Sequence, residues 1–135
     1  MRLSKQVAAL PLRRINGVTE VLLVTSRDTG RWVIPKGWQQ KGRKGHKSAA
    51  REAKEEAGVK GKIEQRSIGS YSYIKPERSA EGPIDVNVYL LSVRKEFKHW
   101  PEQDQRQRAW FAVESAASEV QEPELSSIIA SLAQL

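Results

Sequence analysis

The sequence of 135 residues has no cysteine and only two histidines. The absence of a thiol excludes disulfide bonds, a cysteine nucleophile and a cysteine-based zinc site. His46 and His99 are too far apart in the sequence to indicate a local histidine metal pair. No local signature of a serine–histidine–aspartate triad is present either. These absences exclude thiol chemistry and give no support to a histidine-based site.

Long hydrophobic runs are missing as well. The longest apolar stretch near the start is residues 7–12, six residues. A membrane-spanning helix needs about 20 apolar residues, and a signal peptide needs a longer hydrophobic region followed by a cleavage site. We therefore expect a cytoplasmic protein with no membrane partner.

The composition is that of a folded protein with an excess of positive charge. Hydrophobic residues make up 39% and charged residues 29% of the chain, which is ordinary for a globular domain. We expect a single domain over residues 1–135, because two domains would each be too small to bury a good core. The 23 basic and 16 acidic residues give a net charge of +7. This charge predicts attraction to nucleic acid, to an anionic membrane or to a polyphosphate, and does not choose among them.

Hydrophobic patterning predicts strands and helices in mixed order. Two segments flanking the turn signal Asn16-Gly17 read as a hairpin. The expected strands cover residues 6–14, 19–26, 31–34, 62–75, 84–97 and 108–113. The expected helices cover residues 48–57, 114–120 and 124–132. This arrangement is typical of a mixed-sheet α/β (α+β) sandwich.

The helix expected over residues 48–57 presents three carboxylates on one face. At about 100° per residue, Glu52, Glu55 and Glu56 lie together, and alanines occupy the adjacent face. Like charges three and four residues apart repel each other. A solvated acidic face is one interpretation. The other is a site for a hard divalent cation, because Mg²⁺ prefers oxygen ligands.

Residues 37–59 resemble the Nudix box, G-x5-E-x7-R-E-U-x-E-E-x-G-U. The matching positions are Gly37, Arg51, Glu52, Glu55, Glu56, Gly58 and Val59. Ala53 stands at the aliphatic position, and Arg43 stands where the family has its first glutamate. The order of strands also fits the family, so the resemblance implies a Nudix-type α/β/α sandwich over nearly the whole chain.

Other segments are similar to one branch of the family, which hydrolyses diphosphoinositol polyphosphates and diadenosine polyphosphates. They are residues 26–27 and 31–37, and Trp100, Arg106, Arg108, Trp110 and Phe111. The resemblance implies a metal-dependent pyrophosphohydrolase that cleaves a phosphoanhydride bond in a small-molecule polyphosphate, with Mg²⁺ or Mn²⁺ as cofactor. A nucleoside triphosphate pyrophosphatase is the alternative. A basic nucleic-acid-binding domain on the same scaffold is less favoured, and either a monomer or a dimer is compatible.

The resemblance also implies site residues. Glu52, Glu55, Glu56 and the backbone carbonyl of Lys36 are expected metal ligands, and Arg51 is expected to orient Glu52 or its neighbour. The base that activates water is expected to be Glu52, Glu55 or a downstream glutamate. The downstream candidates are Glu102, which we rank first, then Glu81, with Glu77 and Glu96.

Basic residues near the box are expected to bind substrate phosphates. These candidates are Arg27, Arg31, Lys36, Arg43 and Arg108. Arg43 lies with Lys41 and Lys44 in a glycine-rich loop, where charge-assisted hydrogen bonds would suit a highly phosphorylated substrate. Arg108 and Trp110 share one side of the last expected strand, and Trp38, in the loop, is the tryptophan best placed to be exposed.

Overall fold

The first hairpin of the structure is formed by Asn16 and Gly17. The computed structural model describes residues 4–134. Both turn residues have positive φ, 52° and 79°, as a two-residue turn with this twist requires. β1 (Ser4–Ile15) and β2 (Val18–Thr25) therefore pair antiparallel with Ile15 opposite Val18. The predicted hairpin is confirmed.

β1 is the central strand of the sheet, and both of its faces are covered. It runs parallel to β7 (Ile84–Glu96), with Ala8 opposite Val88. Val7 and Ala9 belong to one core, whereas Ala8 and Leu10 belong to the other. A strand buried on both faces reads as a continuous apolar run, which explains residues 7–12.

The other strands complete a mixed sheet of eight strands. They are β3 (Trp32–Val33), β4 (Lys36–Trp38), β5 (Val59–Ile63), β6 (Gly69–Tyr73) and β8 (Arg108–Ala112). The main path is β3-β2-β1-β7-β5; β4 pairs with β1, β6 with β7 and β8 with β2. Within residues 4–134, every strand pair other than β1–β7 is antiparallel.

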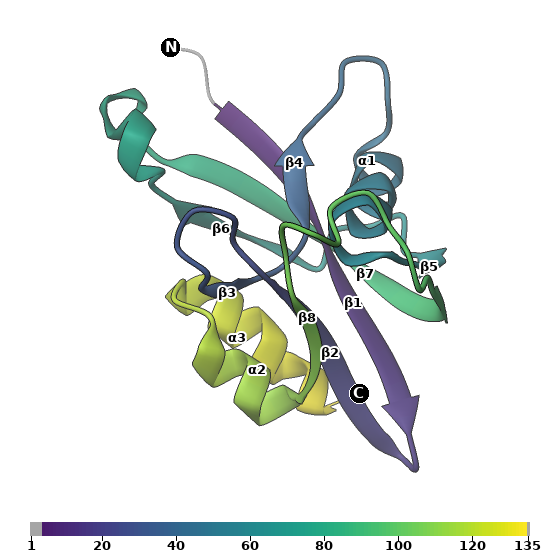
Figure 1. Cartoon of the computed structure of the whole chain (residues 1–135). Helices are drawn as coiled ribbons and strands as arrows, with labels where there is room; N and C mark the ends of the chain where they lie inside the picture. The colour runs from purple at the N-terminus through teal and green to yellow at the C-terminus, as the bar shows by residue number, and fades with distance from the viewer. Residues whose placement is uncertain (1–3, 135) are drawn as a thin grey trace.

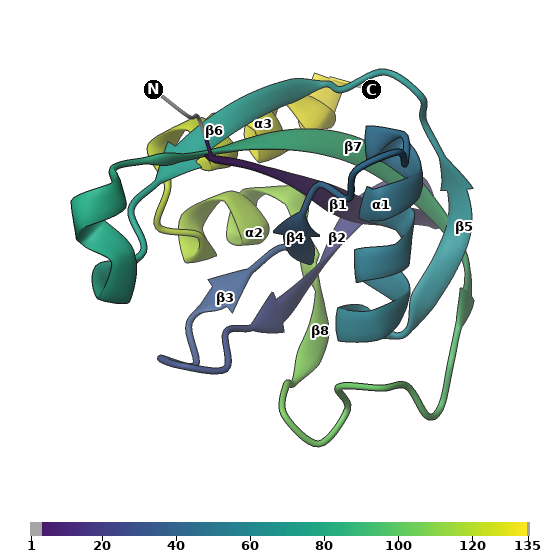
Figure 2. The same cartoon turned by 90° about the horizontal axis from the view of Figure 1, so that it is seen from above.

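Helices cover the two faces of the sheet, as Figures 1 and 2 show. On one face lies α1 (Gly45–Glu52), which continues into the π-helical turn η1 (Ala53–Ala57). The other face is covered by α2 (Val113–Glu119), α3 (Pro123–Ser131) and η3 (Leu132–Gln134). This confirms the predicted α/β/α sandwich. None of the helices in the described part of the chain is long and apolar enough to cross a bilayer.

Two predicted boundaries differ from the structure. The segment expected as one strand over residues 62–75 is divided into β5 and β6, which both pair with β7. The stretch between the strand expected over residues 31–34 and the helix expected over residues 48–57 contains β4 and the first turn of α1. β4 forms because β1 offers it backbone partners, with Val7 opposite Gly37. The helix start was missed because Lys44, its N-cap residue, makes no capping side-chain hydrogen bond.

Alanines on α1 and η1 bring this helix close to the sheet. Ala49, Ala53 and Ala57 are fully buried in the core that includes Val7 and Leu22. The predicted small apolar face is therefore confirmed. Because this face is fixed against the sheet, the carboxylates beside it are directed to the sheet's edge, where β4 lies.

Candidate functional site

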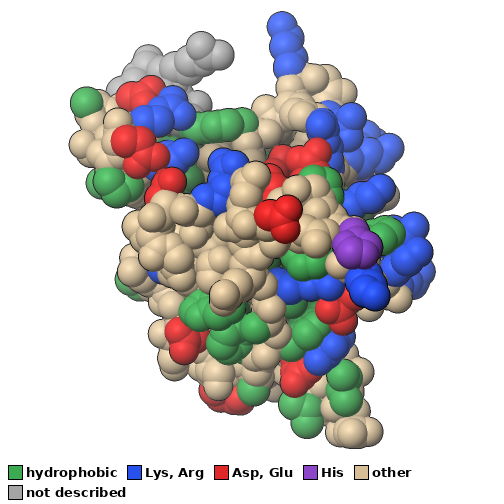
Figure 3. All heavy atoms as spheres, in the orientation of Figure 1, with side chains coloured by type: hydrophobic (Ala, Val, Ile, Leu, Met, Phe, Trp, Pro, Cys, Tyr) green, Lys and Arg blue, Asp and Glu red, His purple; other side chains and the backbone are tan. Residues whose placement is uncertain are grey.

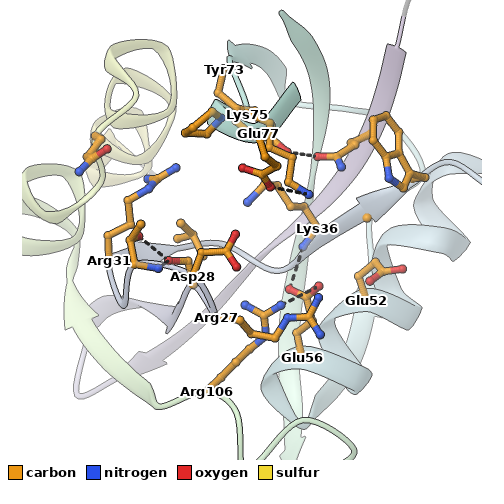
Figure 4. A pocket seen from close by; sticks show the side chains of 18 of the residues that line it. Arg27, Asp28, Arg31, Lys36, Glu52, Glu56, Tyr73, Lys75, Glu77 and Arg106 are labelled. Carbon is orange, nitrogen blue, oxygen red and sulfur yellow. Dashed lines mark hydrogen bonds and ion pairs between the residues drawn. The ribbon is translucent and has the colours of Figure 1, made fainter. Parts of the chain in front are cut away.

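A cleft of about 670 Å³ opens beside the carboxylate face of α1 (Figure 4). Five cationic side chains line it: Arg27, Arg31, Lys36, Lys75 and Arg106. Five carboxylates line it as well: Asp28, Glu52, Glu56, Glu77 and Glu102. A wall with both signs of charge can accept a cation and a polyanion together.

Glu56 is the most deeply placed carboxylate of this set. Its residue is only 7% exposed. One carboxylate oxygen accepts the Lys36 backbone N–H at 3.2 Å, and the other lies 3.5 Å from the Arg106 guanidinium. Burial raises the pKa of Glu56 to about 7, and the neighbouring Glu52 adds to this effect, whereas Arg106 opposes it. Burial likewise lowers the pKa of Lys36 to about 8.

Glu52 lies directly against Gly37. A Cβ added at Gly37 would lie 2.5 Å from the Glu52 carboxylate, so a side chain there would displace it. Burial is the main cause that raises the pKa of Glu52, and Glu55 and Glu102 add to it by repulsion, while Arg51 opposes it. The first glycine of the box therefore leaves space for the first carboxylate of the helix.

Glu55 has a different environment. Arg51 donates to its carboxylate at 3.1 Å, and the cleft lining does not include it. Across residues 4–134, no three acidic or histidine side chains form a ready-made metal-ligand group. Mg²⁺ in phosphate-processing sites is commonly held by one or two carboxylates together with waters and substrate phosphates. Glu52 and Glu56 fit that description, because both present carboxylate oxygens to the cleft and burial there raises the pKa of each, which disfavours the anion unless a cation is bound. The roles of Glu55 and of the Lys36 carbonyl stay predictions.

Arg106 is a cleft residue that the sequence analysis did not assign. Its side chain is 9% exposed. It donates to the Glu102 carboxylate at 2.7 Å and to the Thr25 backbone oxygen at 3.0 Å, besides its contact with Glu56. In the sequence, Glu102 and Arg106 are four residues apart in a polar segment. This spacing is compatible with an ion pair, but only the folded loop shows that the pair forms.

The candidate bases divide into two groups. Glu102 and Glu77 line the cleft. Glu81 pairs with Arg78, and Glu96 lies 3.5 Å from Arg13, so the structure brings neither of them to the cleft. Glu102 remains the leading candidate, since it lies on the same wall as Glu52 and Glu56.

The predicted phosphate-binding residues also divide. Arg27 and Arg31 line the cleft. Arg27 donates to the Gln105 side chain at 3.2 Å, whereas Arg31 pairs with Glu122 at 2.8 Å. Arg43 is exposed, and the cleft lining does not include it.

Arg108, a predicted phosphate-binding residue, is not part of the cleft lining. Its guanidinium donates to the backbone oxygens of Ala57, Gly58 and Phe97 and stacks 3.8 Å from the Trp100 ring centre. As predicted, Arg108 and Trp110 share one side of β8. They lie opposite Val24 and Leu22, which belong to the core under α1. On this side of β8, Arg108 contacts the end of the helix, outside the cleft.

Trp38 is exposed, as expected, although it ends β4 and does not lie in a loop. It lines the cleft and is 40% exposed. Arg78 from η2 (Pro76–Glu81) lies 5.0 Å from its ring centre. The cleft therefore has an aromatic wall at its rim, next to a further cation.

With this geometry established, comparison with known proteins defines the class. Residues 4–132 match the model of the NUDIX domain, and the chain belongs to this family. It is 34% identical over 110 residues to "Nudix hydrolase 16, mitochondrial" of Arabidopsis thaliana, an alignment that covers 78% of this chain and 61% of that protein. The chain spans only 51–61% of the length of three such plant relatives.

The predicted branch resemblance is also confirmed. The chain is 35% identical over 120 residues to diphosphoinositol polyphosphate phosphohydrolase 3-beta of Bos taurus, covering 87% of this chain and 70% of that protein. Among solved structures, a C. elegans Ap4A hydrolase in a binary complex superposes with a TM-score of 0.75 at 23% identity, covering 98% of this chain and all of the other. This second likeness shows a shared fold.

Proposed function

We propose that this chain is a metal-dependent pyrophosphohydrolase that cleaves a phosphoanhydride bond. The observation that supports it most is the position of Glu52 and Glu56 in the same cleft as Arg27, Lys36 and Arg106. Carboxylates can hold a divalent cation, and guanidinium groups can bind phosphate oxygens by paired hydrogen bonds. A binding module for polyanions alone would gain nothing from buried carboxylates on the same wall.

The proposed substrates are diphosphoinositol polyphosphates or dinucleoside polyphosphates. Relatives in this family are named for the first class, and a structural neighbour is named for Ap4A. The five cations around the cleft match a substrate with several phosphates. The exposed ring of Trp38 is a surface on which a nucleobase can stack. Loss of activity toward dinucleoside polyphosphates alone in Trp38→Ala would identify that role.

The chain's own residues divide the work of the reaction. Glu52 and Glu56 would hold Mg²⁺ or Mn²⁺, which when bound offsets the charge that develops on the phosphoryl oxygens. Arg27 and Arg106 would bind and orient the phosphates. Glu102 would accept the proton of the attacking water on the carboxylate oxygen that does not bind Arg106. Because Arg106 contacts both Glu56 and Glu102, it fixes the two carboxylates relative to each other.

A substrate panel tests the proposal directly. Phosphate release is measured for a diphosphoinositol polyphosphate, a dinucleoside polyphosphate and a nucleoside triphosphate, with Mg²⁺, with Mn²⁺ and with EDTA. We expect cation-dependent hydrolysis of one of the first two, abolished by EDTA and in Glu56→Gln. Preferred hydrolysis of the triphosphate would support the alternative activity. Turnover that persists in EDTA would contradict the metal assignment.

A further inference from the structure

The end of the helix that holds Glu55 and Glu56 is bound by one distant segment, residues 97–108. A helix end leaves backbone carbonyls without intrahelical partners. Here the carbonyls of four consecutive residues, 55–58, accept hydrogen bonds from that segment. The donors are Glu102 N–H to Glu55 (3.1 Å), Trp100 Nε1 to Glu56 (3.1 Å), Arg108 Nη1 to Ala57 (2.8 Å) and Gly58 (3.2 Å), and Phe97 N–H to Gly58 (2.7 Å).

Arg108 and Trp100 form the centre of this contact. The Arg108 guanidinium stacks on the Trp100 ring, and its Nη2 donates to the Phe97 backbone oxygen at 2.7 Å. The guanidinium therefore bridges the helix end and the start of the 97–108 segment. A planar fork with several donors can do this, whereas an ammonium group cannot reproduce the geometry.

Gly58 allows the stacked pair to approach. Its φ is +66°, a value that favours glycine. A Cβ at this position would lie 2.6 Å from Arg108 Nη1 and 2.7 Å from the Trp100 ring. The second glycine of the box is therefore required by packing as well as by its backbone conformation.

The same segment brings two side chains into the cleft. Glu102 and Arg106 lie between Trp100 and Arg108 in the sequence, and both line the cleft beside Glu56. The backbone hydrogen bond from Glu102 N–H to the Glu55 oxygen is one of the contacts that residues 97–108 make with the helix end. The position of Glu102 relative to the helix carboxylates is thus set by contacts that are themselves outside the cleft.

We propose that Arg108 and Trp100 are positioning residues that fix Glu102 and Arg106 relative to Glu52 and Glu56. This inference rests on the proposed function. It assigns to Arg108 an effect on turnover and on cation binding, with little effect on substrate affinity. For a residue that contacts the substrate phosphates, we would instead expect a large effect on substrate affinity and a smaller effect on turnover.

Two variants and one matched control test this assignment. Arg108→Lys keeps the charge and loses the planar guanidinium. Trp100→Phe keeps a stacking ring and loses the N–H that donates to the Glu56 backbone oxygen. Arg13→Lys is the control, because Arg13 also stacks on a tryptophan, 4.1 Å from the Trp110 ring centre, and is not part of the cleft lining. Three measurements are made below the unfolding temperature: steady-state kinetics for kcat and KM, Mn²⁺ affinity without substrate, and hydrogen exchange at the Glu102 amide.

We expect kcat to fall about tenfold or more in both variants, because displacement of a reacting group by about 1 Å can cost about a hundredfold. KM should change less than about threefold. Mn²⁺ should bind more weakly, and the Glu102 amide should exchange faster. Arg13→Lys should leave all of these quantities unchanged.

Other results overturn the proposal. A raised KM with unchanged kcat in Arg108→Lys would make Arg108 a substrate-binding residue. A lower unfolding temperature with kcat and Mn²⁺ affinity intact would reduce the contact to structural support. If the wild-type chain hydrolyses none of the substrates, the proposed function fails separately. Unchanged Mn²⁺ affinity and Glu102 exchange in both variants would then still refute the positioning role.

Discussion

Two regions of this chain concentrate charge, and the structure treats them differently. The loop over residues 41–44 holds Lys41, Arg43 and Lys44, all exposed. The cleft wall holds Glu56, which is 7% exposed, and Arg106, whose side chain is 9% exposed. Exposed charges are screened by water and salt beyond about 8 Å at physiological ionic strength, whereas buried ones act on each other strongly. The burial of the charged side chains, more than their number along the sequence, therefore distinguishes the site from a solvated surface.

Exposed basic side chains also gather outside the 41–44 loop on the face shown in Figure 3. Figure 3 shows lysine and arginine side chains gathered along the edge formed by α1 and β5. Exposed lysines on an edge strand such as β5 also discourage pairing with another chain. The net charge of +7 is thus spread over surfaces with separate roles, and only part of it faces the cleft.

The largest effect should come from the most buried carboxylate. Glu56→Gln keeps the size and removes the charge. We expect at least about a hundredfold loss of turnover, in line with about 3 kcal/mol for one well-placed transition-state contact. The measurement is kcat with Mg²⁺, with folding followed by circular dichroism.

Glu55→Gln sharpens that result. Glu55 binds Arg51 and is not part of the cleft lining, so we expect a smaller loss than for Glu56→Gln. Equal losses would show that Glu55 leaves Arg51 and joins the site when the cation binds. Near-normal activity in Glu56→Gln would remove the metal assignment altogether.

Gly37→Ala should have the next largest effect. The added methyl would lie 2.5 Å from the Glu52 carboxylate, so that Glu52 must move. We expect about a tenfold loss of kcat, because misplaced reacting groups are costly even when the fold is intact. Gly42→Ala is the comparison, since nothing lies within 4 Å of a Cβ there, although its φ of +80° makes some loss of stability expected. Unchanged kcat in Gly37→Ala would mean that Glu52 does not have to lie at this place.

The sequence predicted the fold well because periodicity and local turn signals agreed with the long-range pairing. Asn16-Gly17 defined the hairpin, and the alanines of α1 defined the packed face. The carboxylates could be placed on one helix face for the same reason. Their different environments could not be predicted, because Glu55 pairs with Arg51 and Glu56 contacts Arg106 from a distant segment.

Arg106 and Arg108 show the limit most directly. They are only two residues apart in the sequence, and Arg108 is the first residue of the last expected strand, 108–113. β8 begins at Arg108, so Arg106 lies in the preceding loop and turns into the cleft, whereas Arg108 binds the helix end. Loop conformation depends on contacts distant in sequence, such as that of Arg106 with the Thr25 oxygen, and no local pattern encodes it.

Among the arginines, Arg27 should matter for substrate affinity. Within residues 4–134 its guanidinium donates to Gln105 through Nη1, and its other donors can bind a phosphate. For Arg27→Ala we expect KM to rise about fivefold with little change in kcat, equivalent to about 1 kcal/mol of binding. The effect should shrink as salt is added. A fall in kcat at constant KM would instead place Arg27 at the reacting phosphate.

The smallest effect should come from Arg43, which stands where the family motif has a glutamate. Its side chain is exposed and the cleft lining does not include it. Water and salt screen a charge of this kind, so Arg43→Ala should change KM less than about twofold, and Arg43→Glu should restore the family residue without raising kcat. The measurement is KM for the preferred polyphosphate at low and at physiological salt. A KM rise in Arg43→Ala as large as that in Arg27→Ala would show that the 41–44 loop contacts the substrate, and depth in the fold would then no longer separate the two charged regions.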